Sequence, residues 1–503
     1  MAGKLVHPLI RSILERYRTI WALNHMKWLA HWDLNTYMPE DGSKARAEAL
    51  SKVEILSQSL FLETSFVHAI TDAAMHEKEF NDHERAVIRL LKRTLNFYQR
   101  LPPSFIESFT KVTSEAHLVW KRAKETSNFS LFAPFLEKIV DLSRKKAEYL
   151  GYKVHPYDAL LDEYDEGLTT ADVVAYFATI KDALQHMVRR ITTSQNYREE
   201  HNLEHEVYAL DEMKKLAQKI LEIVHYNLNN LRLDTSPHPF STGIGEGDTR
   251  ITTRYEGKDF ARSLTAVIHE YGHALYETQA HDELAYTPLA GGSSLIVHES
   301  QSRLWENIIG RSREFLEMLH PHIKALGKNF ERYTIDDIYR YLNLVKPGVI
   351  RVDADEITYH FHVMIRFEIE KSLIEGTLVV KDVPKVWNER YREYLGVVPE
   401  NDAQGVLQDI HWSQGSIGYF PTYSLGTALS AIIARRIEYD LGPVASLVQD
   451  KDDLRKIQDW LHHHIHQHGS TYMFADVAQK IAKTPFTSAP LLQYLEHKYA
   501  ALY

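Results

Sequence analysis

The chain has 503 residues, of which 44% are hydrophobic and 25% charged, a composition typical of globular proteins with several hydrophobic cores or one extended helical body. A formal net charge of -10, without a basic cluster, argues against nucleic acid as the main partner. There is no cysteine, so a metal ion would have to be held by histidine and carboxylate side chains. No signal-like apolar run opens the chain and no apolar run reaches about 18 residues, so we expect a cytoplasmic protein with no membrane partner.

Residues up to about 230 carry apolar side chains mostly at helical spacing. This periodicity predicts helices over residues 11–34, 170–192 and 206–231, with interruptions at the prolines near residues 39 and 102. The acidic segment 154–168 contains turn residues, and we expect it to be a solvated surface segment. No internal repeat is evident in this half.

The next segments differ in composition. Prolines on both sides of His238 predict a stiff turn over residues 236–240, and residues 248–255 are rich in threonine and predict a strand. Asp248, Arg250 and Thr252 would share one face of that strand. The strand could offer its edge to an extended peptide and point Arg250 into a groove, or it could form the solvent-facing side of a small sheet. The spacing favours neither interpretation.

Residues 260–277 predict one helix, with Asp259 as its N-cap. This helix contains His269-Glu270-Tyr271-Gly272-His273, an H-E-x-x-H motif. A helix brings residues i and i+4 onto one face, so His269 and His273 can bind a single ion. Glu270 projects about 100° round from His269, where a general base can take a proton from water. The alternative for so short a motif is a chance match, with two histidines bonding locally.

A second helix is predicted to begin near Ser293, after the break at residues 291–292. It carries His298 and Glu299, and either side chain could provide a third metal ligand. Three protein ligands with a fourth position open to water are typical of catalytic zinc sites, whereas structural sites close all four positions. The spacing of these residues leaves the choice between His298 and Glu299 open.

Two later segments add candidate residues. Asp353 and Glu356 are spaced as a capping box, which places Arg351 just outside a predicted helix. Arginine binds carboxylates with a planar fork, so Arg351 could hold the C-terminus of a peptide or form an ordinary structural ion pair. His411, Tyr419 and Tyr423 lie on or next to a glycine-rich turn and are suitable donors for a developing oxyanion.

The histidine-rich run 460–468 has no carboxylate spaced to complete a second metal site, so we expect a surface helix there.

Taken together, five motifs occur in an order that resembles the thermostable, Taq-type metallocarboxypeptidase family: His238-Pro-Phe240, Asp248-x-Arg-x-Thr252, His269-Glu-x-x-His273, His298-Glu-Ser-Gln301 and Gly405-x-x-Gln-Asp-x-His-Trp412. Segments 32–39, 157–162 and 498–503 also look like that family, so the resemblance spans nearly the whole chain. One departure is Leu295-Ile-Val-His298, where a glycine is expected nearer the ligand.

The resemblance implies a mainly α fold, a single elongated helical body with a long active-site groove and a small β-sheet beside the metal helix. Residues 1–503 would form one catalytic domain. Residues 1–235 would be mainly helical, with N-terminal helices covering the groove, and residues 236–503 would contain the metal site and the substrate-binding part. A homodimer is also implied.

For individual residues, the resemblance implies that His269, His273 and Glu299 bind one divalent metal per chain, zinc or alternatively cobalt, with Glu270 as general base. Arg351 would bind the substrate's terminal carboxylate, and His411 with Tyr423, or with Tyr419, would stabilise the transition state. Asp248 with Arg250, and Gln408 with Asp409, would close one end of the groove and limit substrate length. The residues implied to contact the substrate are His238, Asp248, Arg250, Thr252, Gln408 and Asp409.

The resemblance therefore implies a metal-dependent carboxypeptidase that releases single C-terminal residues of broad type from peptides. An oligopeptidase would share the metal site and differ in what blocks the groove. An aminopeptidase is disfavoured because no acidic cluster is placed to bind an α-amine. A non-catalytic helical binding or scaffold protein could keep the motif, but the intact Glu270 argues against it.

Overall fold

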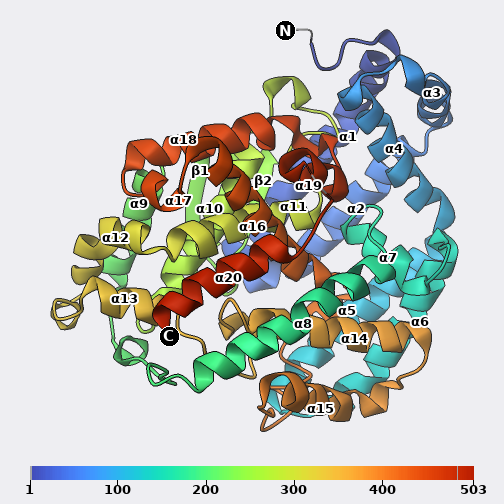
Figure 1. The fold of residues 1–503 in the computed structure, drawn as a ribbon. Coiled ribbons are helices and arrows are strands. Elements are labelled where there is room, and N and C mark those ends of the chain that lie inside the picture. The colour runs from blue at the N-terminus through green and yellow to red at the C-terminus, as the bar shows by residue number, and fades with distance from the viewer. Residues whose placement is uncertain (1–2, 484) are drawn as a thin grey trace. The chain divides into compact units, whose positions relative to one another are not determined.

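The computed structural model describes residues 3–483 and 485–503, and helices make up most of it (Figure 1). The chain divides into two compact units, each assembled from three separate stretches. The first unit comprises the described residues of Met1–Tyr98, His201–Leu342 and Ser430–Pro485, and the second those of Gln99–Glu200, Asn343–Leu429 and Phe486–Tyr503. The interpretation of residues 1–503 as one domain stays a prediction.

Two helices, α4 and α16, cross a boundary between units. The other helices of the first unit are α1 (Pro8–Thr36), α2 (Ser43–Phe61), α3 (Thr64–Met75), α9 (Leu210–Ile223), α10 (Phe260–Thr278), α11 (Leu295–Arg303), α12 (Arg313–Lys324), α13 (Ile335–Leu342), α17 (Val444–Leu447), α18 (Lys451–His464) and α19 (Phe474–Ala482). Those of the second unit are α5 (Pro103–Glu125), α6 (Phe129–Leu150), α7 (Pro156–Tyr164), α8 (Thr170–Thr192), α14 (Tyr359–Glu375), α15 (Val383–Leu395) and α20 (Ala489–Leu502). The crossing helices are α4 (Asp82–Arg100) and α16 (Pro421–Leu441). No helix of the described residues has the length and apolar character needed to span a membrane.

Local sequence signals account for several helices. α8 confirms the helix predicted over residues 170–192. This helix begins after Thr169 because Thr169 and Asp172 form a capping box there. The prediction for residues 11–34 is confirmed by α1. The helix predicted over residues 206–231 is wrong at its end, because His225 has a left-handed φ of 50° and stops the helix.

Two further expectations about local structure are wrong. Segment 154–168 contains the helix α7, and Tyr157, Leu160 and Leu161 of that helix are buried rather than solvated. Asp259 occupies the N-cap position of α10 but has a left-handed φ of 51° and makes no side-chain capping bond. Its carboxylate instead accepts a hydrogen bond from Tyr341.

A three-stranded sheet lies in the first unit, in the order β1-β3-β2. Its strands are β1 (Leu231–Thr235), β2 (Ser241–Gly245) and β3 (Asp248–Thr253). β3 pairs parallel with β1 and antiparallel with β2, and β2 and β3 pack against α10. The mainly α fold class with a small sheet beside this helix is confirmed. The idea that β3 offers its edge to a peptide is wrong, because both of its edges are already paired.

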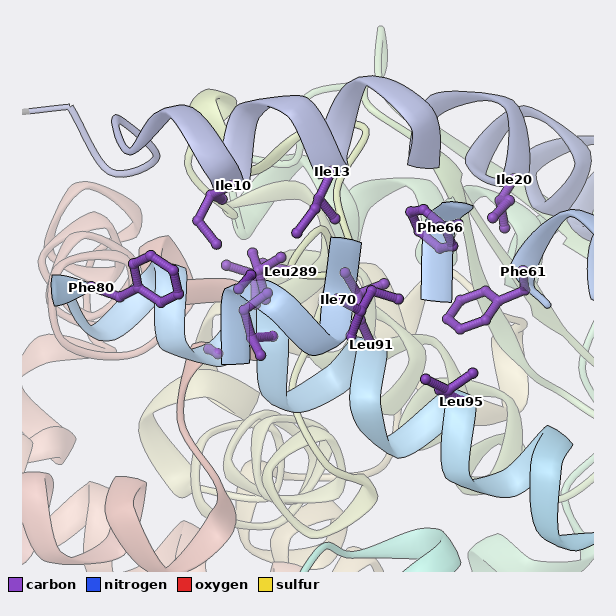
Figure 2. Close-up of a cluster of buried hydrophobic side chains, with 14 of the residues drawn as sticks. Ile10, Ile13, Ile20, Phe61, Phe66, Ile70, Phe80, Leu91, Leu95 and Leu289 are labelled. Atoms are coloured by element: carbon purple, nitrogen blue, oxygen red, sulfur yellow. The ribbon is translucent and has the colours of Figure 1, made fainter. Parts of the chain in front are cut away.

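The N-terminal helices share one apolar core with the loop that follows α10 (Figure 2). Ile10 and Ile13 of α1, Ile70 of α3 and Leu91 of α4 are at most 2% exposed and point toward one another. Leu289 belongs to the same cluster. Burying each of these side chains contributes about 1.5–3 kcal/mol, so the cluster anchors the loop between α10 and α11 to the N-terminal helices.

Candidate metal centre

The helices α10 and α11 cross at Gly272. A Cβ atom at this position would lie 2.6 Å from the Gln301 carbonyl oxygen and 2.7 Å from the Ser302 Cα atom. Only a glycine therefore lets the two backbones approach this closely. Ser294 caps the start of α11, where its hydroxyl accepts a bond from the Val297 amide at 3.4 Å. This crossing brings the C-terminal part of α11 over the two histidines of α10.

Three side chains converge at the crossing. One ligand atom from each of His269, His273 and Glu299 lies within 4.8 Å of the other two. The Oε2 atom of Glu299 is 3.8 Å from His269 Nε2 and 3.5 Å from His273 Nε2. Two imidazole nitrogens and one carboxylate oxygen are the donor set of catalytic zinc sites, so these residues fit one divalent ion. Among the described residues, this group has the composition and spacing for metal binding.

Glu306 contacts His269, the first histidine of the motif, on the ring nitrogen opposite to the one that faces Glu299. It lies on η5 (Leu304–Gly310), a π-helical segment that continues α11, and its Oε2 is 2.8 Å from His269 Nδ1. The same carboxylate accepts bonds from Arg303 at 3.1 Å and from Arg311 at 2.9 Å. Such a partner orients a ligating imidazole and sets its tautomer. We did not predict Glu306 from the sequence, although its position two helical turns after Glu299 is a signal that could have identified it.

His298 supports the second histidine. Its Nδ1 lies 2.8 Å from His273 Nδ1, and its Nε2 lies 2.5 Å from Glu277 Oε1. Gly292 makes room for this ring, since a Cβ there would lie 2.5 Å from it, and its amide donates to Glu277 at 3.1 Å. If His273 presents Nε2 to an ion, its Nδ1–H donates to His298, which in turn donates to Glu277. Of the two candidates for the third ligand, Glu299 therefore lies at the convergence and His298 lies behind His273.

The acidic side chains of this centre are buried, whereas its two imidazoles are partly exposed. Glu270 is 6% exposed, and burial together with the nearby Glu299 and Glu306 raises its pKa to about 7, despite a hydrogen bond from Ser241. Burial opposes the ionisation of Glu299, but Arg303 and the two imidazoles hold its pKa well below the usual range. A buried carboxyl group beside the ligand set is thus available to exchange a proton.

The strand motif lies in the same unit. Arg250 donates to Asp248 with both arms of its guanidinium, at 2.8 Å and 2.7 Å. Its side chain lines a cavity of about 480 Å³ together with residues of α1, among them Trp32. Thr252 is buried, and its hydroxyl accepts a bond from the Phe240 amide at 2.9 Å and lies 2.7 Å from the Ser236 hydroxyl. Thr252 therefore holds the turn that contains His238.

A second group of predicted residues meets in the second unit, around Arg351. This side chain is 6% exposed and lies in η7 (Arg351–Asp353), not beside a helix start. Its guanidinium bonds to Asp409 at 2.9 Å and to the Tyr359 hydroxyl at 2.8 Å, and its amide donates to Gln408 at 2.8 Å. Arg366 pairs with the other oxygen of Asp409 at 2.6 Å. Two buried guanidinium groups thus face one carboxylate.

The capping box expected at Asp353 and Glu356 is wrong. The side chain that accepts from the free amides before α14 is Asp355, at 2.9 Å from both Ile357 N and Thr358 N. Glu356 is instead buried against Lys498, whose Nζ lies 3.0 Å from both of its oxygens.

His411 lies close to both candidate tyrosines. It begins η9 (His411–Gln414), and its Nε2 is 3.1 Å from the Tyr423 hydroxyl. The rings of Tyr419 and Tyr423 are 5.2 Å apart, and the guanidinium of Arg351 lies 5.0 Å from the Tyr423 ring. Burial, and then the positive charge of Arg351, lower the pKa of His411 to about 3. This imidazole is therefore neutral near pH 7.

The histidine-rich run is only partly a surface helix. α18 ends at His464, whereas His466 is fully buried and contacts α10 and α11. Its Nδ1 lies 2.6 Å from Gln279 Oε1 and its Nε2 lies 2.8 Å from Gln301 Oε1. The prediction failed here because periodicity within α18 says nothing about the chain after its last turn.

Comparison with known proteins identifies the family. Residues 12–499 match the family described as Carboxypeptidase Taq (M32) metallopeptidase. The chain is 41% identical to thermostable carboxypeptidase 1 of Pyrococcus furiosus over 97% of its own length and 98% of that protein. It is 34% identical to carboxypeptidase 1 of Bacillus subtilis over 99% of both chains.

The fold agrees with solved structures of similar proteins. A structure of Pyrococcus furiosus carboxypeptidase superposes with a TM-score of 0.96 at 40% identity, covering 99% of this chain and 100% of that chain. Metallocarboxypeptidase 1 of Trypanosoma cruzi gives a TM-score of 0.92 at 32% identity, covering 97% of this chain and 99% of that one. The chain therefore belongs to the carboxypeptidase Taq (M32) metallopeptidase family and is a metallocarboxypeptidase.

Proposed function

We propose that this metallocarboxypeptidase releases single C-terminal residues of broad type from peptides, using one zinc ion per chain bound by His269, His273 and Glu299. Cobalt is the alternative metal. The observation that supports this most directly is the approach of the three ligand atoms to within 4.8 Å of one another, beside the buried Glu270. Thiolate ligands are excluded, because the chain has no cysteine.

Glu270 is the general base of the proposed reaction. When bound, a divalent ion supplies Lewis-acid catalysis and lowers the pKa of water toward neutrality. Glu270 takes the proton from the attacking water and returns it to the leaving amine. Glu306 and His298 hold the two ligating imidazoles in one orientation, so that little reorganisation accompanies the reaction.

Arg351 is proposed to bind the terminal carboxylate of the substrate. Arg351 and Arg366 are both buried, and their two positive charges face the single carboxylate of Asp409. Buried guanidinium groups stabilise an anion, and a carboxypeptidase must recognise a peptide's terminal carboxylate.

His411 and Tyr423 are proposed as the donors that stabilise the oxyanion, with Tyr419 as the alternative donor. The neutral state of His411 and its 3.1 Å approach to the Tyr423 hydroxyl support a shared hydrogen-bonding role.

The remaining motif residues are proposed to limit substrate length. Asp248 with Arg250, and Gln408 with Asp409, would each limit the length of the bound peptide, while Thr252 would hold the turn that brings His238 to the substrate. The bidentate pairing of Arg250 with Asp248 supports a rigid barrier. We further propose a cytoplasmic homodimer.

Mass spectrometry of an unstructured decapeptide, incubated with the metal-loaded protein with and without a chelator, tests this function. We expect a chelator-sensitive ladder that shortens by one residue at a time from the C-terminus. Internal fragments would instead indicate an oligopeptidase, and shortening from the N-terminus an aminopeptidase. A peptide left intact with zinc, cobalt and manganese would contradict the proposal.

A further inference from the structure

Glu370 of α14 is a buried carboxylate that the proposed reaction does not use. It is 0% exposed and accepts three hydrogen bonds. The donors are the Tyr157 hydroxyl at 2.5 Å, the Trp412 indole at 2.7 Å and the Gly418 amide at 2.9 Å. Burying a carboxyl group costs free energy unless hydrogen bonds compensate for the lost water. A polar group this deep in the fold therefore needs a specific explanation.

Two of the three donors belong to the turn that carries the proposed oxyanion donors. Trp412 directly follows His411, and Gly418 directly precedes Tyr419. The two bonds of Glu370 thus fix both ends of the segment between His411 and Tyr419. α16 begins at Pro421, shortly after this segment. The segment therefore also sets the position of Tyr423, which lies in the first turn of α16.

The helix α7 supports the same turn from a second side. Gly418 has a φ of 102°, and a Cβ atom there would lie 2.7 Å from the Leu160 carbonyl oxygen of α7. The Tyr164 ring lies 5.1 Å from the Tyr419 ring in an edge-to-face arrangement. Tyr164 also hydrogen-bonds to Ser416. Leu160 and Tyr164 of α7 thus contact the turn directly, whereas Tyr157 is linked to it through Glu370.

We propose that Glu370, together with Tyr157 of α7, positions His411 and Tyr423 for the reaction. Both are positioning residues, since they act through the turn. This inference rests on the proposed role of His411 and Tyr423 as oxyanion donors. It also gives a function to segment 157–162, a part of the chain to which sequence analysis assigned no chemical role.

Glu370→Gln changes the hydrogen bonding of this side chain while keeping its size nearly constant. In Glu370→Gln the amide NH₂ must face the Trp412 indole or the Tyr157 and Gly418 donors, so at least one buried donor loses its acceptor. Tyr157→Phe removes a single donor and leaves the carboxylate in place. Glu368→Gln is the matched control, because Glu368 lies on the same helix and bonds instead to the Tyr394 hydroxyl at 2.6 Å.

The assay measures kcat and KM for a short blocked peptide, with circular dichroism, the unfolding midpoint and the bound metal content measured for each variant. Since small misplacements of groups that bind the transition state lower kcat, we expect Glu370→Gln to lower kcat by about tenfold or more, with KM changed by less than about twofold. Tyr157→Phe is expected to lower kcat by about threefold, in the same direction. Glu368→Gln should match the parent.

Coupling to Tyr423 separates positioning from general loss of structure. In a Tyr423→Phe background, Glu370→Gln should lower kcat less than it does in the parent, because one of the two donors that it positions is already absent. Equal losses in both backgrounds, or a folded Glu370→Gln protein with kcat within about twofold of the control, would overturn the inference. If Tyr423→Phe itself leaves kcat unchanged, the oxyanion assignment fails first. If Tyr423→Phe lowers kcat and Glu370→Gln does not, the positioning role alone fails.

Discussion

Replacing Glu270 by glutamine should have opposite effects on activity and stability. Glu270 is not one of the three converging ligand side chains, so Glu270→Gln leaves His269, His273 and Glu299 in place. The amide cannot accept a proton, and general acid–base catalysis contributes about 10²–10⁴-fold to a rate, so we expect kcat to fall by that range. The metal content should match that of the parent protein.

The stability effect follows from the burial of the carboxyl group. Burial raises the pKa of Glu270 from its ordinary 4.5 to about 7. At about 1.36 kcal/mol per pKa unit, keeping this group ionised in the folded metal-free protein costs about 3 kcal/mol. Because the folded-state pKa is raised, this cost is absent below pH 4.5 and is reached in full above pH 7. The metal-free Glu270→Gln protein should therefore be more stable than the parent at pH 8 and similar to it at pH 4.

The assay combines hydrolysis of a dipeptide-capped substrate, metal analysis of the purified protein and thermal unfolding after chelation. The control is Glu246→Gln, the same change at an exposed position in the turn between β2 and β3, which should alter none of the three measurements. Hydrolysis by Glu270→Gln at the parental rate would refute the base assignment. An unfolding midpoint below that of the parent at pH 8 would refute the electrostatic reasoning.

Three further predictions concern other parts of the molecule. His298→Ala should weaken metal binding by about 10–100-fold in a chelator competition, because His273 loses the partner that orients its ring; unchanged affinity would contradict this role. Burial opposes the ionisation of Asp409, but Arg351 and Arg366 hold the pKa of this carboxyl group well below its usual range. The ionised Asp409 therefore stabilises the fold above pH 3.8, and this stabilisation is lost as the pH falls further. Asp409→Asn should thus lower the unfolding midpoint at pH 7, and the deficit should shrink below about pH 4; a deficit independent of pH would show that the ion pair is not its cause. Ile70→Ala should destabilise the first unit by about 2–5 kcal/mol in denaturant unfolding, whereas Ile55→Ala, at a side chain that is 57% exposed, should change stability by less than about 0.5 kcal/mol.

Much of α10 could be predicted from the sequence, because the positions of its side chains depend on local spacing alone. His269 and His273 share a face for any residues spaced i and i+4 on a helix, and Glu270 lies beside them for the same reason. The bounds of α8 were equally predictable, since Thr169 and Asp172 cap its first turn within the helix itself. The strand β3 could be identified from its own composition, although its neighbours β1 and β2 were missed because each has only five residues.

Tertiary structure decided which side chains become partners. The choice of Glu299 over His298 at the convergence depends on the crossing at Gly272, where the backbones of α10 and α11 approach too closely for a Cβ atom. The pairing of Arg351 with Asp409, rather than with a residue of its own helix, likewise depends on two segments that are distant in the sequence.

The sequence by itself therefore determined the chemical groups of this metallocarboxypeptidase and their order along each helix. The fold decided their orientation, because hydrogen bonds such as those of Glu306, Glu277 and Glu370 form only where separate backbones meet. Periodicity describes one helix at a time, whereas an active centre requires side chains from several elements to occupy one small volume.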